Sequence, residues 1–175
     1  MKGIILYKSK YGATEKYARW LSEETGFPAA EIARADLEEV EGCGCVILCG
    51  GVYASGFAAL PFLKKNLELL KNKRLFVLCV GASPYDEEAF QEGIRRNMKE
   101  GLEHIPCFYA RGAWDLDRMN LIDRNLCKLL RKTVAKKDPS TYAVWEKALM
   151  AAGDAPCDWT DRAYLKPLLD AVRAG

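Results

Sequence analysis

The sequence predicts an α/β fold in which helices cover both faces of a doubly wound, five-stranded parallel sheet. Short apolar runs alternate along the chain with longer amphipathic stretches, which is the pattern of strand–helix–strand units. The short runs are almost continuously apolar, as is typical of parallel strands that are buried on both faces. The chain has 175 residues, half of them apolar, and this suits one domain with a substantial core.

Five segments are expected to form the strands. Four are strongly apolar and a weaker one follows Pro28; in chain order the five are 3–7, 29–33, 45–49, 75–80 and 105–109. Ligands of such sheets bind beyond the carboxyl ends of the strands, where the strand order reverses. The segments that follow the first, third and fourth strands, residues 9–14, 50–56 and 81–86, should therefore meet at one edge of the sheet.

Amphipathic stretches between the strands predict the helices. The first covers 15–25 and stops at Gly26, and the second carries leucines from Leu60 to Leu70. A third helix is expected over 86–102, with Phe90, Ile94 and Met98 facing inward. A fourth is expected over 119–134, and its apolar stripe consists of Ile122, Leu126, Leu129 and Leu130.

The character of the chain changes after Lys137-Asp138-Pro139-Ser140. Two more helical stretches follow, over 141–152 and 161–174, and the segment between them contains Gly, Pro and Asp and is expected to be a loop. We interpret residues 138–175 as a helical C-terminal extension that packs on a single domain formed by residues 1–175.

The composition of the chain limits the kinds of partner that we expect it to bind. The net charge is +2 and there is no dense basic run, so we expect no nucleic-acid partner. No apolar stretch reaches the length of a membrane span, which leaves room only for peripheral membrane contact. The N-terminus has no secretory pattern, so a cytoplasmic location is expected. Seven cysteines without a C-x-x-C pair, and a single histidine, predict reduced structural thiols and no metal site.

The segment Ser9-Lys10-Tyr11-Gly12-Ala13-Thr14 leads from the first strand into the first helix. The unpaired N–H groups of a helix N-terminus favour anions. Hydroxyl groups of Ser9 and Thr14 add donors, and Gly12 allows close approach of the backbone. This loop lacks the patterns that bind nucleoside triphosphates or dinucleotides, so we expect it to hold one terminal phosphate.

Two further loops predict a flat ligand beside that phosphate. The first contains Gly51, Val52, Tyr53, Ala54 and Ser55, in which small residues flank an aromatic ring. The second contains Gly81, Ala82, Ser83 and Tyr85; Ser83 and Pro84 could also simply begin the next helix. Together the three loops form a slot for a planar ring with one phosphate, a description that FMN fits.

These loops resemble those of the flavodoxin family, and the resemblance covers nearly the whole chain. It implies a flavodoxin-like sheet of order 2-1-3-4-5, with FMN held by the three loops. It is closest to the branch that contains menaquinone-dependent protoporphyrinogen dehydrogenases, on Phe62-Leu63-Lys64-Lys65-Asn66, Ala110-Arg111-Gly112-Ala113, Asp123-Arg124 and Asp158-Trp159-Thr160-Asp161. The best-known enzymes of that branch carry a long basic insertion before the fifth strand, where this chain has an ordinary helix.

Three functions stay open at this point. The first, which we favour, is an FMN redox protein whose partner is a redox protein or a small-molecule donor or acceptor. The second is a menaquinone-dependent protoporphyrinogen dehydrogenase of heme biosynthesis, in which Arg111 would bind a substrate carboxylate. The third is an interaction module without flavin. No side chain stands out as an acid–base catalyst, which agrees with chemistry that resides in the cofactor.

Overall fold

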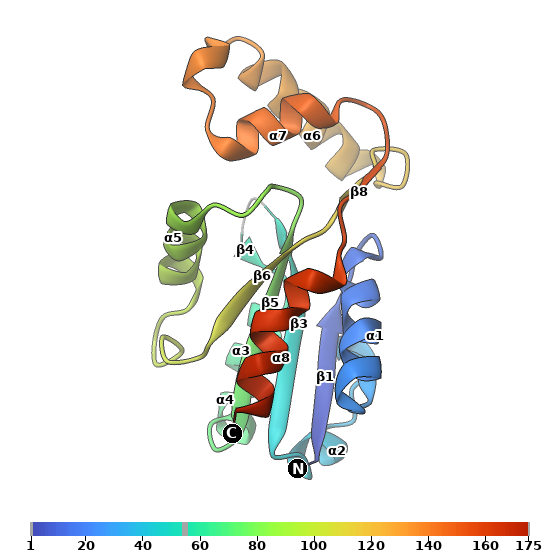
Figure 1. The fold of residues 1–175 in the computed structure, drawn as a ribbon, viewed down its shortest axis with the longest axis vertical. Coiled ribbons are helices and arrows are strands. Elements are labelled where there is room, and N and C mark those ends of the chain that lie inside the picture. The colour runs from blue at the N-terminus through green and yellow to red at the C-terminus, as the bar shows by residue number, and fades with distance from the viewer. Residues whose placement is uncertain (1, 54–55, 175) are drawn as a thin grey trace.

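A parallel sheet forms the centre of the computed structural model, which describes residues 2–53 and 56–174 (Figure 1). The sheet has the order β2-β1-β3-β5-β6, and the short β4 pairs antiparallel with the end of β3. Counted in chain order without β4, the five parallel strands have the order 2-1-3-4-5, so the predicted fold is confirmed. The strands are β1 (Gly3–Lys8), β2 (Ala29–Glu31), β3 (Cys45–Tyr53), β4 (Gly56–Phe57), β5 (Arg74–Gly81) and β6 (Cys107–Arg111).

Alternate residues of the central strands enter two separate cores. In β1, Ile4 and Leu6 belong to one buried cluster and Ile5 belongs to the other. Ile5 lies beside Ile47 of β3, which in turn lies beside Phe76 of β5, so the same alternation runs across the sheet. Both faces are therefore covered, and this explains why the strands are continuously apolar in sequence.

Short helices cover one face of the sheet. They are α2 (Leu37–Glu41), α3 (Leu60–Lys65), α4 (Leu67–Leu70) and α5 (Glu87–Asn97). The helix expected over 60–70 is broken at Asn66, whose side-chain amide donates to the Phe62 carbonyl oxygen at 2.9 Å and competes with the helical backbone. The helix expected over 86–102 ends early, at Asn97, because Met98 leaves the helical conformation with φ −94° and ψ 78°. Glu100 and Gly101 then take positive φ angles of 61° and 92°, so the helix does not resume.

Two helices from opposite ends of the chain cover the other face. They are α1 (Ala13–Thr25) and α8 (Lys166–Arg173), and the 3-10 turn η3 (Arg162–Leu165) leads into α8. Leu165 and Leu168 are fully buried against this face, together with Tyr17 of α1. Figure 1 shows α8 lying along the sheet beside α1, with both chain termini at the amino end of the strands.

The remaining helices form a hairpin beyond the carboxyl ends of the strands (Figure 1). It consists of α6 (Leu121–Val134), the 3-10 turn η2 (Pro139–Thr141) and α7 (Val144–Ala152). A two-stranded antiparallel ribbon of β7 (Ala113–Trp114) and β8 (Cys157–Asp158) connects it to the sheet. Trp114, Leu116, Val134 and Leu149 form its own small core.

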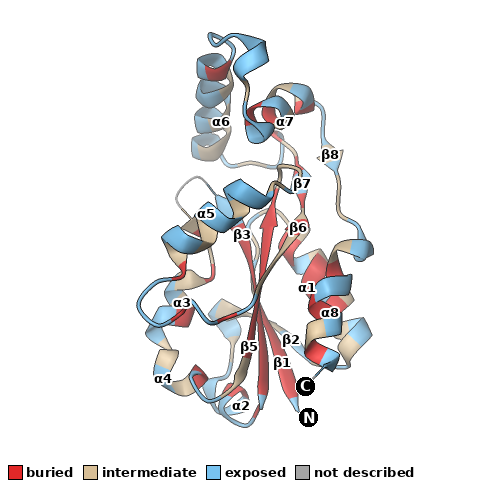
Figure 2. Ribbon diagram, turned by 60° about the vertical axis from the view of Figure 1, so that its left-hand side comes forward, coloured by how far each residue is buried: buried red, intermediate tan, exposed pale blue. Residues whose placement is uncertain are grey.

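The apolar stripe of α6, the fourth helix expected from the sequence, does not pack against the sheet. Leu121 and Ile122 are each 72% exposed, and Leu126 and Leu129 are 59% and 62% exposed. Figure 2 shows α6 coloured mainly as exposed. The physical reason is that α8 already covers the face that such a helix would occupy. Helix α6 turns Cys127 and Val134 toward the hairpin core instead.

We predict that Leu168→Ala lowers the free energy of unfolding by about 2–5 kcal/mol, because it leaves a cavity against the sheet. The matched change Leu126→Ala, on the exposed face of α6, should change that energy by less than about 0.5 kcal/mol. Chemical denaturation measures both. Equal losses in the two variants would contradict the assignment of α8, rather than α6, to the sheet.

Candidate functional site

The three predicted loops meet at the carboxyl edge of the sheet. The Gly112 N–H donates to the Gly81 carbonyl oxygen at 2.7 Å, and a side chain at Gly112 would lie 3.4 Å from the Cβ of Ala13. The Lys10 ammonium lies 5.8 Å from the centre of the Tyr53 ring. The segments after β1, β3 and β5 are therefore neighbours, as the sequence predicts.

The loop after β1 is closed on itself. The N–H of Gly12 donates to the Ser9 Oγ at 3.1 Å, and Gly12 takes the N-cap position of α1 with a φ of 96°. That conformation favours glycine strongly. Ala13 begins the helix and Thr14 is buried in its first turn, so the N–H groups of this turn end at the loop.

Helix α6 adds a carboxylate to this loop that the sequence analysis did not place there. Asp123, in the first turn of α6, forms an ion pair with Lys10 and accepts a hydrogen bond from the Tyr11 hydroxyl. The hydrogen bond from Lys10, followed by that from Tyr11, lowers the pKa of Asp123, and the same pair raises the pKa of Lys10. The hairpin is thus tied to the loop through polar contacts.

Arg118 is a second residue of this site that the sequence analysis missed. Its guanidinium nitrogens lie 3.6 Å and 3.9 Å from the position that a Cβ would take at Gly12. The Asp115 carboxylate holds the turn by accepting from the N–H groups of Asp117 and Arg118, at 3.0 Å and 3.3 Å. Nothing in the local sequence indicates that Arg118 faces a loop more than a hundred residues away.

A pocket of about 200 Å³ adjoins the β1 loop and is lined by Tyr11, Ala13, Trp114 and Arg118 among others. Trp114 is 9% exposed, and its indole Nε1 is buried with no hydrogen-bond partner in the part of the chain that the structure describes. A buried donor without an acceptor costs free energy. The lining of this pocket combines one cation, Arg118, with the carboxylates of Asp115 and Asp158, next to Ala13 at the start of α1.

The segment after β3 differs from the expected loop. Strand β3 continues to Tyr53, because Val52 and Tyr53 pair with Phe57 and Gly56 of β4. Gly51 is consequently in the strand, and Val52 and Tyr53 are exposed at its end. Ala54 and Ser55 lie outside the described residues.

Helix α5 is capped by Asp86 and not by Ser83. The Asp86 carboxylate accepts from the Ala89 N–H at 2.8 Å, while the Ser83 carbonyl oxygen accepts from the Tyr109 hydroxyl at 2.7 Å. Tyr85 is exposed and packs between Phe90 and Tyr109, with ring centres 5.7 Å and 5.8 Å away. Its hydroxyl donates to Glu87.

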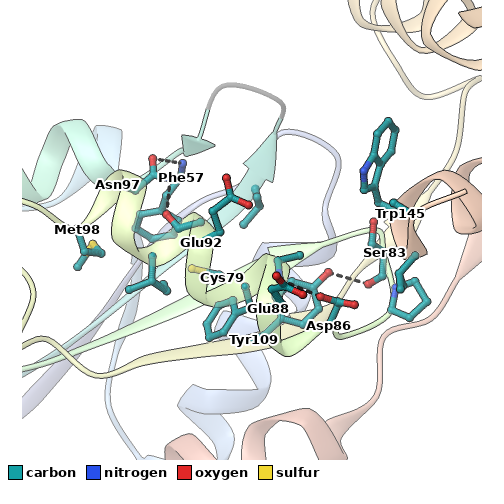
Figure 3. Close-up of a pocket in the computed structure, with 18 of the residues that line it drawn as sticks. Phe57, Cys79, Ser83, Asp86, Glu88, Glu92, Asn97, Met98, Tyr109 and Trp145 are labelled. Atoms are coloured by element: carbon teal, nitrogen blue, oxygen red, sulfur yellow. Dashed lines mark hydrogen bonds between the residues drawn. The ribbon is translucent and has the colours of Figure 1, made fainter. Parts of the chain in front are cut away.

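A larger pocket of about 600 Å³ lies between α5, the ends of β3 and β5, and the start of α7. Figure 3 shows it extending from Asn97 and Met98 at one end to Trp145 at the other. Its lining is mainly apolar, but three carboxylates, Asp86, Glu88 and Glu92, belong to it and no described lysine, arginine or histidine does. Beside β1, the smaller pocket is lined by Arg118 together with the carboxylates Asp115 and Asp158. The edge of the sheet is thus polar, with charges of both signs, beside β1, and apolar with an acidic rim beside α5.

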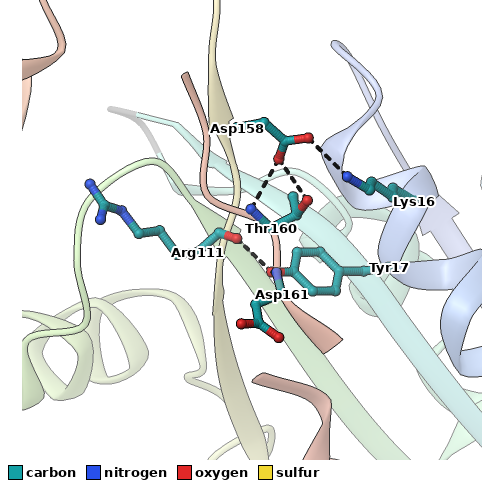
Figure 4. Close-up of polar contacts among 6 residues, drawn as sticks. All are labelled: Lys16, Tyr17, Arg111, Asp158, Thr160 and Asp161. Atoms are coloured by element: carbon teal, nitrogen blue, oxygen red, sulfur yellow. Dashed lines mark hydrogen bonds and ion pairs between the residues drawn. The ribbon is translucent and has the colours of Figure 1, made fainter. Parts of the chain in front are cut away.

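Arg111 lies between these two regions and connects three segments. Its Nε donates to the Ala82 carbonyl oxygen at 3.1 Å, and its guanidinium stacks 4.0 Å from the centre of the Trp159 ring. Its backbone carbonyl oxygen accepts from the Tyr17 hydroxyl at 2.6 Å, and that hydroxyl accepts from the Asp161 N–H at 3.0 Å (Figure 4). Arg111 therefore orients Ala82 at the edge of the sheet.

The tail that carries Asp158 is anchored by charge. Asp158 pairs with Lys16 at 2.8 Å and accepts from the N–H and hydroxyl of Thr160 (Figure 4). Desolvation opposes ionisation here, but the hydrogen bonds from Lys16 and Thr160 outweigh it and lower the pKa of Asp158 to about 2. Burial, the largest influence on Tyr17, raises the pKa of that phenol to about 12, so it stays a neutral donor.

The surroundings of the cysteines suit a packing role and not a reactive one. All seven are free, and Cys45, Cys49, Cys79 and Cys107 lie in the strands where the sequence placed them. Burial raises the pKa of each of these four thiols, which disfavours the reactive thiolate. Within residues 2–53 and 56–174, no group of three metal-ligating side chains gathers, and no helix has the length and apolar character needed to cross a membrane.

We predict that Tyr17→Phe lowers the free energy of unfolding by about 1–3 kcal/mol, because it leaves the Arg111 carbonyl and the Asp161 N–H unpaired. Tyr164→Phe is the matched control, since Tyr164 packs against the same core without a recorded hydroxyl hydrogen bond in the described chain. Thermal and chemical unfolding compare the two. A control that loses as much stability would show that the Tyr17 hydroxyl has no special role.

Comparisons with known proteins give the family. Among solved structures, the chain is similar to the two-electron reduced flavodoxin of Megasphaera elsdenii, at 14% identity over 61% of this chain and 82% of that one, with a TM-score of 0.46. It is also similar to a WrbA-like flavodoxin of Agrobacterium tumefaciens, at 14% identity over 74% and 91% of the two chains, with a TM-score of 0.47. No curated protein sequence matches significantly.

The family model of the flavodoxin domain matches residues 4–141. This match spans the five parallel strands, all three loops at the carboxyl edge, and α6. With the sheet order of a flavodoxin-like fold and more than half of the chain matched, the protein belongs to the flavodoxin domain family.

Proposed function

We propose that the protein binds FMN at the carboxyl edge of the sheet and transfers electrons through it. Membership of the flavodoxin domain family supports a flavin-binding redox protein. The observation that carries the proposal is the division of the edge into a polar site beside β1, where Arg118 lies near the N-terminus of α1, and an apolar surface beside β3 and β5. A planar ring that carries one phosphate matches both parts.

The phosphate would occupy the polar side beside β1. The N–H groups of the first turn of α1, the hydroxyls of Ser9 and Thr14, and the Tyr11 and Lys10 side chains supply donors there. Arg118 adds a positive charge beside Gly12. Asp123 now takes donors from Lys10 and Tyr11, so it would release them or share them when an anion binds.

The ring would lie across the ends of β3 and β5. Gly51, Val52 and Tyr53 border one side, with Ala54 and Ser55 as further proposed contacts, and Gly81, Ala82, Ser83 and Tyr85 border the other. Gly81 has no room for a side chain, since a Cβ would lie 2.4 Å from the Tyr109 hydroxyl. Arg111 holds the Ala82 carbonyl oxygen in place and thereby fixes the backbone that faces the ligand.

Bound FMN supplies the electron transfer, and the residues of this chain bind it, orient it and keep water from part of its surface. The apolar side chains of Val52 and Tyr53 exclude water on one side of the proposed slot. No catalytic side chain is proposed. A cytoplasmic location and a single domain over 1–175, including the extension 138–175, are part of this proposal.

The electron donor and acceptor are proposed to be a redox partner protein or a neutral small molecule such as a quinone. A porphyrinogen is less well supported, because its propionates would meet Asp86, Glu88 and Glu92 in the larger pocket. Arg111 is the cation that could offset them, but its Nε and the face of its guanidinium are already engaged by Ala82 and Trp159. A flavin-free module would not need the cation and donors gathered beside Gly12.

We predict that Thr14→Val weakens FMN binding by about ten- to hundredfold while leaving riboflavin binding unchanged. The change removes one hydrogen bond to a charged phosphate, which is worth about 1.5–3 kcal/mol. Titration of the apoprotein with each flavin measures this. Thr25→Val, at the far end of α1, is the control. If riboflavin binds the unaltered protein as tightly as FMN does, the phosphate assignment is wrong.

We also predict that Tyr53 and Tyr85 quench the fluorescence of the bound flavin by stacking against it. Both are exposed aromatic residues at the carboxyl edge, 39% and 48% accessible. Each is replaced by alanine and the emission of bound FMN is recorded, with Tyr164→Ala, in η3, as a control for the loss of a tyrosine that lines neither pocket. Unchanged emission in both variants would remove the tyrosines from the proposed site.

A further inference from the structure

Helix α6 exposes an apolar face that no other described part of the chain covers. Four of its residues, Leu121, Ile122, Leu126 and Leu129, are between 59% and 72% exposed, and Leu130 is 40% exposed. The helix is 14 residues long, and Asn120 caps it by accepting from the Asp123 N–H at 2.8 Å. The exposed face therefore belongs to a well-formed helix and is larger than the scattered apolar residues of an ordinary surface.

A row of lysines runs beside this face. Lys128 and Lys132 are four residues apart in α6, which places them on one side of the helix, and Lys136 follows in the turn after the helix ends at Val134. All three are exposed. None of them forms an ion pair with another described residue, whereas Arg131 pairs with Asp154 and Lys137 with Glu146 inside the hairpin. The lysine row therefore makes no described ion pair that would stabilise the fold.

The charge is concentrated in this part of the chain. Residues 118–137 contain seven basic side chains and one acidic side chain, Asp123, although the whole chain carries a net charge of only +2. The remainder of the protein is therefore net acidic. A surface that is basic and apolar at once attracts an anionic and apolar counterpart.

The composition of the face distinguishes among the occupants it could have. A second copy would bring its own lysine row against the first, and like charges would oppose the contact. Protein interfaces favour Trp, Tyr and Arg at their centre and are depleted in Lys, but the large exposed apolar residues of this face are all Leu or Ile, with Asn125, Thr133 and lysines exposed among and beside them. Leucine and isoleucine beside lysine are typical of a helix that lies in a lipid interface.

We propose that α6 docks the protein on the surface of an anionic lipid bilayer, with its Leu and Ile face in the interface and its lysine row against the headgroups. Because the hairpin stands beyond the carboxyl ends of the strands, docking brings that edge of the sheet toward the membrane (Figure 1). The lipid contact would be made by α6 and not by flavin, so a test of this docking is independent of a test of the proposed function.

The test is co-sedimentation of the full chain with vesicles of phosphatidylcholine alone or mixed with phosphatidylglycerol. We expect binding to the mixed vesicles, much weaker binding to the neutral ones, and loss of binding in high salt. Leu126→Ser with Leu129→Ser should lower the vesicle partition coefficient by on the order of tenfold or more. Lys128→Glu with Lys132→Glu should abolish the preference for the anionic lipid.

Matched controls lie elsewhere on the surface. Leu37→Ser changes a leucine that is 46% exposed in α2, and Lys65→Glu changes an exposed lysine of α3; neither should alter vesicle binding. Melting temperatures verify that each variant is folded. The proposal is overturned if the unaltered chain ignores anionic vesicles, if the α6 variants bind as it does, or if α6 instead holds together a dimer that Leu126→Ser dissociates.

Discussion

Burial of the parallel sheet on both faces is the constraint on which the rest of this structure depends. The central strands alternate their side chains between two cores, so each face needs a helical layer. Helices α2 to α5 supply one layer, and α1 and α8 supply the other. Because Leu165 and Leu168 arrive from the C-terminal end to complete the second layer, the segment between β6 and η3 is released from the sheet and can stand over its carboxyl edge.

The parts of the fold that the sequence could predict are those set by local pattern. The strands were predictable because their apolar runs are continuous, and the order of the sheet followed from the family resemblance. The boundaries were not predictable from local pattern. Pairing with β4 extends β3 to Tyr53, and the non-helical backbone of Met98 ends α5. Helix α6 shows the same limit, because periodicity marks its apolar face but cannot say what covers that face.

In the candidate site, too, some parts could be predicted from the sequence and others could not. The backbone loops were predictable, since parallel strands place their following segments at one edge and Gly12 marks the turn into α1. Asp123, Arg118 and the lining of the larger pocket by α7 were not, because they come from the hairpin, far along the chain. The N-cap of α5 was also not decided by the sequence, because Ser83 and Asp86 are both residue types that cap helices. In the structure the backbone places Asp86, and not Ser83, where its carboxylate accepts from the Ala89 N–H.

Helix α6 contributes both to the proposed phosphate site and to the proposed lipid contact. The first turn of α6 carries Asp123, which holds Lys10 and Tyr11 at the proposed phosphate site, while the next turns carry the exposed leucines and lysines. A force on the outer face of α6 would therefore act on the contacts of the β1 loop. An anion bound in that loop would compete with Asp123 for Lys10 and Tyr11, so the proposed phosphate and the anchoring of α6 would use the same two side chains.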